Sequence, residues 1–206
     1  MIKKVAFIGL GVMGFPMAGH LSSKNSNLEI KVYNRSIEKT EKWVSKFNGI
    51  LTKTPAEAAE NSDIVFMCVG NDKDVNQVVR GDVGIMATIP ENSIIVDHTT
   101  ASAKIALNLY DFCKSTKNVS FIDAPVSGGQ AGAENGQLTI MVGGDESSYL
   151  KVEALLKSYA KNSTLIGNSG SGQLAKMVNQ ICIAGLLQGL SEAVNFGQKV
   201  NLDMDK

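Results

Sequence analysis

The stretch "KVAFIGLGVMGFPMAGHL", from Lys4 to Leu21, decides the expected fold. It begins with a short apolar run, which is typical of a strand buried on both faces of a sheet. The run ends in "GLGVMG" (Gly9 to Gly14), which fits the pattern G-x-G-x-x-G, and a helical pattern follows directly. A glycine-rich turn between a strand and a helix is the context in which this pattern indicates dinucleotide binding.

The glycines of this turn have separate roles. Gly9 permits the tight turn, Gly11 lets a pyrophosphate approach the backbone, and Gly14 lets the helix pack closely on the strand. Free N–H groups at the helix start then face the phosphates. A plain tight turn is the alternative interpretation. The predicted phosphate loop comprises Gly9, Leu10, Gly11, Val12, Met13 and Gly14.

The rest of the chain alternates short apolar segments with helical patterns. We expect strands at 4–9, 29–34, 63–69, 93–98, 119–125, 137–144 and 163–167. We expect helices at 13–23, 37–47, 55–60, 72–80, 101–114 and 146–159. This alternation predicts an α/β fold with a doubly wound, Rossmann-type, mostly parallel sheet. From about Gly170 onward one long helix is expected.

Composition excludes several classes of function. Lys+Arg and Asp+Glu both total 20 in the 206 residues, so no nucleic-acid partner or membrane surface is indicated. No stretch reaches the roughly 18 apolar residues of a membrane span. Cys68, Cys113 and Cys182 lack metal-ligand spacing, so we expect no metal, and scattered thiols favour the cytoplasm. The N-terminus imitates a signal peptide, but the glycine spacing and the lack of a cleavage site disfavour one.

The end of the second strand bears on the choice of dinucleotide. An NAD site usually has an acid there, bonded to the ribose 2′-OH, whereas this chain has Asn34 and Arg35. The planar fork of Arg35 can grip a 2′-phosphate, with help from Ser36 and Lys39. An exposed arginine at a strand end is the alternative. We expect NADP(H) to be favoured over NAD(H).

Three loops at the carboxyl ends of the strands are further candidates, since ligands of such folds bind there. The small turn formed by Val69, Gly70 and Asn71 fits under a cofactor ribose or nicotinamide. Thr99 and Thr100 offer two hydroxyls, of which one can cap the next helix while the other faces the site. Exposed N–H groups of the loop 127–129 can cradle a carboxylate, unless the loop is only a flexible turn. Its members are Ser127, Gly128 and Gly129.

Lys176 opens a long segment with little charge. On a helix from Gly172 to Ala193, both sides become apolar after two turns, which is typical of a helix buried all round. Asn179 lies three residues after Lys176, so both side chains can point into one cleft. A partly desolvated ammonium has a lowered pKa and can act as a general acid. The alternative is a surface lysine where the helix emerges.

Four motifs, in order along the chain, resemble those of the β-hydroxyacid dehydrogenases, the family of 3-hydroxyisobutyrate dehydrogenase and tartronate semialdehyde reductase. They are "FIGLGVMGFPMAGHL", "DHTT", "DAPVSGGQAGAENGQLTIMVGG" and "GSGQLAKMVNQ". His20 stands where the family often has Asn, and Thr99 replaces Ser. The resemblance implies an NAD(P)H-dependent reduction of a small semialdehyde or 2-oxo acid, with Lys176 as proton donor.

The resemblance also implies roles for the loops. Ser127, Gly128 and Gly129 would hold the substrate carboxylate, and Asn179 would orient the substrate. Thr99 is assigned to the substrate side. Val69, Gly70, Asn71 and Thr100 are assigned to the cofactor, together with the phosphate loop, Asn34 and Arg35.

The family continues into an all-helical domain that closes the cleft and makes much of the oligomer, whereas this sequence stops at Lys206. We therefore expect a Rossmann domain at 1–166 and, at 167–206, the interdomain helix of a truncated second domain. Because one sheet covers only one side of that helix, we also expect a homo-oligomer. A 6-phosphogluconate dehydrogenase and an inactive dinucleotide-binding module remain alternative functions. Imine reductases share the fold, but Lys176 argues against them because they usually lack this lysine.

Overall fold

One mixed sheet forms the centre of the protein. The structure is a computed structural model that describes residues 2–206. In this part of the chain the sheet has nine strands. They are β1 (Lys4–Ile8), β2 (Glu29–Tyr33), β3 (Ile50–Leu51), β4 (Ile64–Met67), β5 (Ile94–Asp97), β6 (Ser120–Asp123), β7 (Val126–Ser127), β8 (Leu138–Gly143) and β9 (Ala160–Gly167).

The strand order is β3-β2-β1-β4-β5-β6-β8-β7, with β9 also paired to β8. From β3 to β6 all neighbours are parallel. This is the order of a dinucleotide-binding sheet, and it confirms the predicted doubly wound fold. β8 is antiparallel to both β6 and β7, so the sheet is mixed at this edge.

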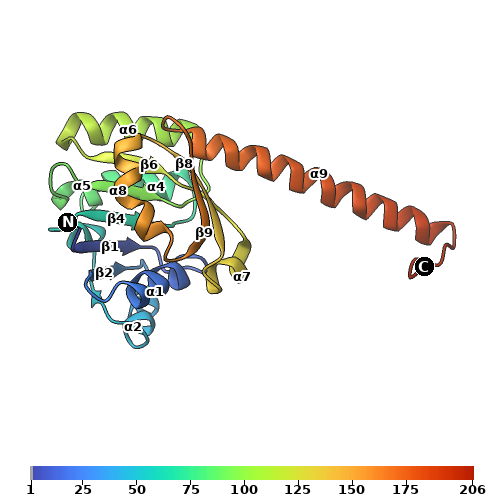
Figure 1. The fold of residues 1–206 in the computed structure, drawn as a ribbon, viewed down its shortest axis with the longest axis horizontal. Helices are drawn as coiled ribbons and strands as arrows, with labels where there is room; N and C mark the ends of the chain where they lie inside the picture. The colour runs from blue at the N-terminus through green and yellow to red at the C-terminus, as the bar shows by residue number, and fades with distance from the viewer. Residues whose placement is uncertain (1) are drawn as a thin grey trace.

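Helices cover both faces of the sheet (Figure 1). Seven of them match expected segments to within a few residues. They are α1 (Gly14–Lys24), α2 (Ile37–Val44), α3 (Pro55–Ala59), α4 (Asp72–Arg80), α6 (Ala103–Lys117), α8 (Glu146–Leu156) and α9 (Ser171–Lys199). The sequence pattern does not predict the short elements β3, β7, α5 (Ile85–Thr88) and α7 (Gly129–Glu134).

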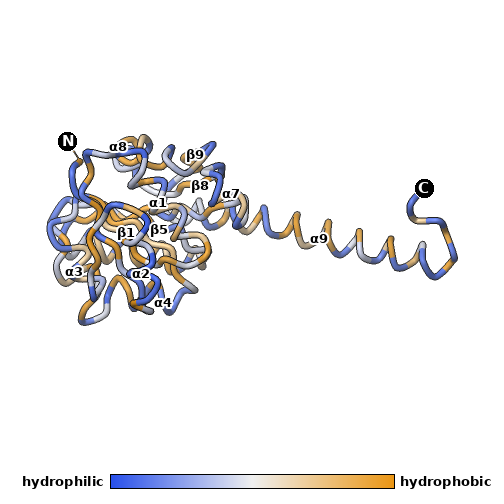
Figure 2. Tube along the Cα trace, turned by 90° about the horizontal axis from the view of Figure 1, so that it is seen from below, coloured by the Kyte–Doolittle hydropathy of each residue, from blue (hydrophilic) through white to orange (hydrophobic). Residues whose placement is uncertain are grey.

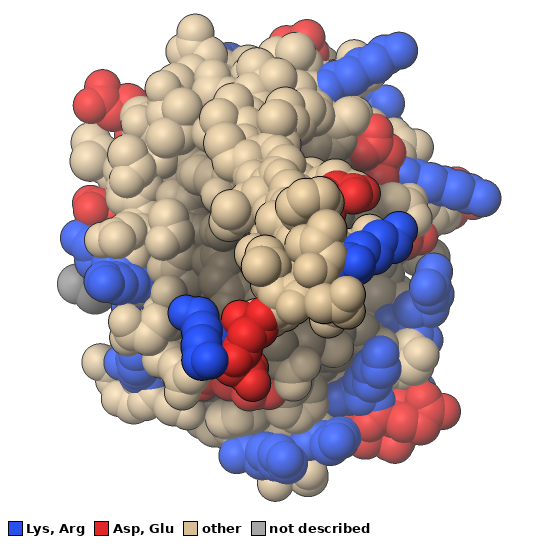
Figure 3. Space-filling model, turned by 90° about the vertical axis from the view of Figure 1, so that its right-hand side faces the viewer, with Lys and Arg blue, Asp and Glu red and all other residues tan. Residues whose placement is uncertain are grey.

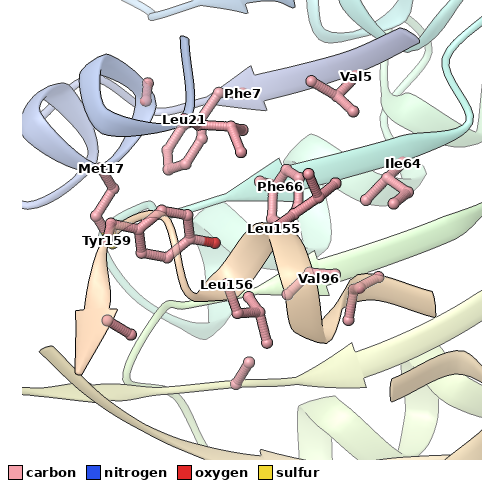
Figure 4. Packing of buried hydrophobic residues seen from close by; sticks show 14 of the residues in the cluster. Val5, Phe7, Met17, Leu21, Ile64, Phe66, Val96, Leu155, Leu156 and Tyr159 are labelled. Atoms are coloured by element: carbon pink, nitrogen blue, oxygen red, sulfur yellow. The ribbon is translucent and has the colours of Figure 1, made fainter. Parts of the chain in front are cut away.

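Two apolar clusters, one on each face, hold these layers together. On one face Phe7 and Phe66 stack with ring centroids 6.1 Å apart, and Tyr159 meets Phe66 edge-on (Figure 4). The opposite face buries Ile8 and Met67 with residues of α4 and α6. Burial on both faces explains why the parallel strands are apolar at nearly every position.

The last helix, α9, leaves this body and extends away from it (Figure 1). Apart from Gly197, the buried residues of α9 lie in its first two turns, and apolar residues recur along the rest of the helix (Figure 2). Ile181 and Leu186 are each 71% exposed. The prediction of one long helix is confirmed. Within residues 2–206 its distal part is largely exposed, except that Leu202 and Met204 of the following turn cover Gly197. None of the helices among these residues is long and apolar enough to cross a membrane.

Candidate active site

The phosphate loop has the backbone shape that its glycines predict. Gly9 has φ +92°, and a Cβ there would collide with the carbonyl oxygen of Cys68. A Cβ on Gly14 would collide with the carbonyl oxygen of Gly9. A Cβ on Gly11 would meet nothing within 4 Å. Gly9 and Gly14 are therefore required by the fold itself, whereas Gly11 borders open space in which a pyrophosphate can lie.

The end of β2 holds this loop in place. The side-chain oxygen of Asn34 accepts a hydrogen bond from Leu10 N at 2.9 Å, and its amide donates to Ser36 O at 3.0 Å. The Leu10 side chain is buried in the core, so its side chain and its N–H are both engaged within the protein. Among the described residues no side chain caps α1, which leaves the helix N-terminus free for phosphate.

A cavity of about 420 Å³ runs from the phosphate loop along the end of β2. Gly9 and Gly11 line one end of it, and Arg35, Ser36 and Lys39 line the other. This volume lies within the ordinary range for small-ligand sites. The residues predicted to bind a 2′-phosphate thus share one cavity with the phosphate loop.

A second cavity, of about 600 Å³, lies where the loops after β4, β5 and β7 meet α9. The surface is hollowed beside α9 when the protein is viewed along this helix (Figure 3). Both cavities are lined by Cys68, Val69 and Gly70, so they form one continuous cleft. The cleft follows the carboxyl ends of the parallel strands, where ligands of this fold bind. The second cavity is lined further by Met13, Thr99, Thr100, Ser127, Gly128, Gly129 and Lys176.

Lys176 lines the second cavity. It lies in the second turn of α9 and is only 8% exposed. Desolvation lowers the pKa of its ammonium. Within residues 2–206 no carboxylate lies within ion-pair distance of it. A lysine that is partly desolvated and unpaired gives up its proton more readily than one at the surface.

Ser127 and Asn179 meet beside the second cavity, which Ser127 lines and Asn179 does not. The Ser127 hydroxyl lies 3.5 Å from the side-chain oxygen of Asn179, which joins β7 to α9 across 52 positions of sequence. Gly128 and Gly129 have φ of +130° and +60°, a conformation that favours glycine. The loop therefore turns sharply beside Lys176 and presents backbone groups there.

The two threonines differ from expectation, because neither of them caps α6. Ser102 is the cap, and its hydroxyl accepts from Ile105 N at 3.1 Å. The Thr99 hydroxyl accepts from Val69 N at 3.0 Å, and the residue is buried. Thr99 thus fastens the loop after β4, and its contact with substrate stays a prediction. Thr100 is exposed on the cleft wall.

Asn71 is also engaged within the protein. Its side-chain oxygen accepts from Lys73 N at 2.9 Å and from Asp74 N at 3.1 Å, so it caps α4. It is absent from the linings of the two cavities, whereas its neighbours Val69 and Gly70 line both. The role of Asn71 in cofactor binding stays a prediction.

Two residues that the sequence analysis missed fix the start of α9. The amide of Gln173 donates to Thr99 O at 2.7 Å and accepts from Ala101 N at 3.0 Å. The Asp123 carboxylate accepts from Gly170 N at 2.7 Å and Gln173 N at 3.0 Å. Asp123 begins the motif "DAPVSGGQAGAENGQLTIMVGG", and Gln173 lies in the motif "GSGQLAKMVNQ". A polar side chain among apolar neighbours was the sequence signal that could have indicated these structural roles.

A buried polar pair, His98 and Tyr159, borders the cleft, and His98 lines the second cavity. His98 Nδ1 is 2.7 Å from Ala124 O, and Nε2 is 2.8 Å from the Tyr159 hydroxyl. Burial lowers the pKa of His98 to about 4, so the ring is neutral at pH 7. Because a carbonyl can only accept, Nδ1 carries the proton and Nε2 accepts from Tyr159. Burial also raises the pKa of the neighbouring Asp97 to about 7.

Among the described residues no group of His, Cys, Asp and Glu side chains could hold a metal ion. The cleft therefore offers backbone N–H groups at a helix start, an Arg-Ser-Lys set and one desolvated lysine. Such a combination suits a phosphate-bearing ligand in the first cavity and a separate carbonyl compound beside Lys176 in the second.

Comparisons with known proteins agree with this geometry. Residues 4–167 match the family model described as the NAD binding domain of 6-phosphogluconate dehydrogenase. An uncharacterized oxidoreductase of Shewanella frigidimarina is 52% identical over 202 residues, which are 98% of this chain and 68% of that protein. The probable 3-hydroxyisobutyrate dehydrogenase-like 1, mitochondrial, of Arabidopsis thaliana is 37% identical over 98% of this chain and 60% of its own.

Among solved structures, 3-hydroxyisobutyrate dehydrogenase of Mycobacterium tuberculosis with L-serine has a TM-score of 0.88 and 27% identity. The similarity covers 98% of this chain and 67% of that one. The chain thus spans about two thirds of the length of the relatives it matches. A Rossmann sheet with a free phosphate loop, a matching domain model and these relatives agree: the chain belongs to the 3-hydroxyisobutyrate dehydrogenase family of oxidoreductases and contains its nicotinamide-dinucleotide-binding domain.

Proposed function

We propose that this chain carries the NADP(H) site and the proton donor of a reductase that converts a small semialdehyde or 2-oxo acid into a hydroxyacid. The observation that carries the proposal is the continuous cleft. It joins the phosphate loop at one end to the buried, unpaired Lys176 at the other.

The residues of the cleft suit this reaction. The nicotinamide, when bound, supplies the hydride. Lys176 donates the proton from Nζ to the carbonyl oxygen, and its positive charge stabilises the developing alkoxide. Its lowered pKa brings this donor closer to neutral pH. The loop 127–129 holds the substrate carboxylate, and Asn179 orients the substrate beside Ser127.

The preference for NADP(H) rests on the end of β2. Arg35, Ser36 and Lys39 line the far end of the first cavity, and no acid follows β2 directly. A 2′-phosphate therefore meets two cations there, and the guanidinium of Arg35 can bond it bidentately.

We also propose a cytoplasmic location, a homo-oligomer and a division of the chain into two parts. The three cysteines are all unpaired among residues 2–206, in keeping with a reducing compartment such as the cytoplasm. The exposed apolar residues of α9 support a homo-oligomer. The division at 166/167 falls at the end of β9, just before α9 begins.

Nucleotide titration followed by substrate assays tests the proposal. NADPH and NADH are titrated against the chain by fluorescence, and glyoxylate, succinic semialdehyde and 6-phosphogluconate are then assayed. We expect NADPH to bind more tightly than NADH, with turnover of one of the two aldehydes. Binding of neither nucleotide would refute the proposal.

Two other outcomes favour the alternatives. Turnover of 6-phosphogluconate would identify the activity named in the description of the matching domain model. Nucleotide binding with no turnover would support a dinucleotide-binding module. The exposed distal part of α9 supports that candidate. Ile183 is the last residue of α9 that lines the second cavity, and among residues 2–206 most of the helix beyond it is exposed.

A further inference from the structure

The first cavity contains an acid among its cations. Arg35 and Lys39 reach it from the β2–α2 side, and Asp74 enters its wall from α4. Arg35 Nη1 lies 3.5 Å from Asp74 Oδ1. The guanidinium predicted to bind a 2′-phosphate therefore already has an anionic partner, supplied by a different element of the fold.

Asp74 is held in this position by its surroundings. Its backbone N–H donates to the capping side chain of Asn71 at 3.1 Å. Its carboxylate lies against Gly70, where an added Cβ would collide with it. The Asp74 side chain is 30% exposed, whereas that of Arg35 is 86% exposed. The acid is thus the more enclosed member of the pair in the cavity wall, and the arginine is the more exposed one.

A 2′-phosphate carries a charge of about −1.5 to −2 near neutral pH. To bind Arg35 it must displace the Asp74 carboxylate, and it then remains close to that negative charge. Both effects weaken NADPH binding. The neutral 2′-hydroxyl of NADH meets neither penalty, and it can donate a hydrogen bond to a carboxylate, as it does to the acid of an ordinary NAD site.

We infer that Asp74 is a second determinant of coenzyme choice, which opposes Arg35 and keeps NADH as an acceptable coenzyme. The inference rests on the proposed function, since it assumes that the first cavity receives the adenosine end of the nucleotide. Arg35 and Lys39 favour the 2′-phosphate, and Asp74 reduces that advantage. The choice between coenzymes is then set by two elements that face each other, the start of α2 and the first turn of α4.

The test is the isosteric change Asp74→Asn in the full 206-residue chain. NADPH and NADH are titrated by fluorescence against the variant and the unchanged protein in low salt. We expect the Kd for NADPH to fall by roughly 3- to 10-fold, the scale of one partly exposed charge pair, and the Kd for NADH to stay level or rise. In high salt the change in NADPH affinity should shrink, because the interaction is screened.

Asp111→Asn is the matched control. Asp111 is exposed on α6 and lines neither cavity, so its removal changes the net charge equally without touching the site. We expect it to leave the ratio of the two Kd values unchanged. Asp74→Ser is a second test variant that removes the charge with a different shape, and it should shift the ratio in the same direction as Asp74→Asn.

The results separate this inference from the proposed function. If the unchanged protein binds NADPH but neither Asp74 variant alters the ratio of Kd values, the inference is overturned while the proposed function stands. If Asp111→Asn shifts the ratio as much as Asp74→Asn, overall charge is responsible and the inference is again overturned. Failure of the unchanged protein to bind either nucleotide overturns both.

Discussion

Lys176 owes its expected chemistry to its surroundings. Its burial lowers the pKa of the ammonium, and no carboxylate within residues 2–206 offsets this effect by pairing with it. We expect Lys176→Met to lower kcat by about 10²- to 10⁴-fold, the usual contribution of a positioned general acid. The Kd for NADPH should change little, because Lys176 lines only the second cavity.

Steady-state kinetics and fluorescence titration measure the two effects separately. Lys161→Met is a suitable control, since Lys161 is exposed on β9 and lines neither cavity. Turnover retained by Lys176→Met would remove this lysine from the mechanism.

Asp97 and His98 make stability depend on pH in opposite directions. Burial raises the pKa of Asp97 to about 7, so the contribution of this carboxyl group to the free energy of unfolding is lost as pH rises from about 4 to 7. Burial lowers the pKa of His98 to about 4, so its contribution is lost as pH falls from about 6.5 to 4. Between pH 4 and 6.5 the two effects on the free energy of unfolding partly cancel.

In the variant Asp97→Asn, the pH dependence of the free energy of unfolding should reflect His98 without the opposing effect of Asp97. Its free energy of unfolding, relative to the unchanged protein, should rise by on the order of 1–3 kcal/mol between pH 4 and 7. The asparagine oxygen can still accept from Thr99 N, as Asp97 does at 2.8 Å. Urea unfolding at several pH values measures the difference, and parallel pH curves for the two proteins would contradict it.

Sequence reasoning at this scale succeeded where a motif and a position on an element pointed to the same residue. Ser127 and Lys176 line one cavity, and Asn179 lies beside Ser127 without lining it, while the chemical roles of all three stay predictions. It could not foresee that the Thr99 hydroxyl turns to Val69 N, because that bond depends on how two loops 30 positions apart come to lie. Nor could it foresee that the side-chain oxygen of Asn71 caps α4, and the role of Asn71 in cofactor binding stays a prediction.

At the scale of elements, the turn from β1 to α1 contains glycines with two different roles, close packing at Gly14 and open space at Gly11. Gly14→Ala forces a Cβ into the carbonyl of Gly9, so we expect this variant to lose more than about 2 kcal/mol of stability and to fold poorly. Gly11→Ala meets no atom within 4 Å, so we expect near-normal stability. Its methyl group enters the space left for a pyrophosphate, so nucleotide affinity should fall at least tenfold.

Thermal unfolding and NADPH titration of both variants check this pair of outcomes. The expected pattern is a lower Tm for Gly14→Ala, and an unchanged Tm with weakened binding for Gly11→Ala. Unaltered NADPH affinity in Gly11→Ala would place the pyrophosphate elsewhere.

The regular elements could be predicted because parallel strands buried on both faces leave long apolar runs, and helices separate these runs. The antiparallel part was not predicted, since β7 has two residues and β8 follows it after the short helix α7. Such short pieces gain their stability from neighbours distant in sequence, and they leave little periodic pattern of their own.

The whole molecule is a folded body with a long helix projecting from it. Apolar side chains are exposed on all sides of that helix, among them Ile181, Leu186, Leu190 and Phe196. We expect a second copy of this chain to cover some of this surface, so the apparent mass should rise with concentration. Light scattering over a range of concentrations measures this effect.

A double variant, Ile181→Gln with Leu186→Gln, should lower the apparent mass towards that of one chain. The same substitution at Leu150, which is 62% exposed on α8, serves as the control. A mass equal to one chain at the highest concentration, for the unchanged protein, would contradict the expectation. The sequence indicated that α9 needs a cover, but its uncharged faces carry no information about which surface provides it.

The length of α9 has a mechanical consequence. Its 29 residues span about 43 Å, and Lys176 lies only about 8 Å from the end that Asp123 and Gln173 hold. A tilt of about 5° about that fixed end would move the tip by nearly 4 Å and Lys176 by less than 1 Å on this geometry. Under such a tilt the helix would act as a rigid lever with Lys176 beside the pivot, so a movement at the far end would reach Lys176 strongly reduced.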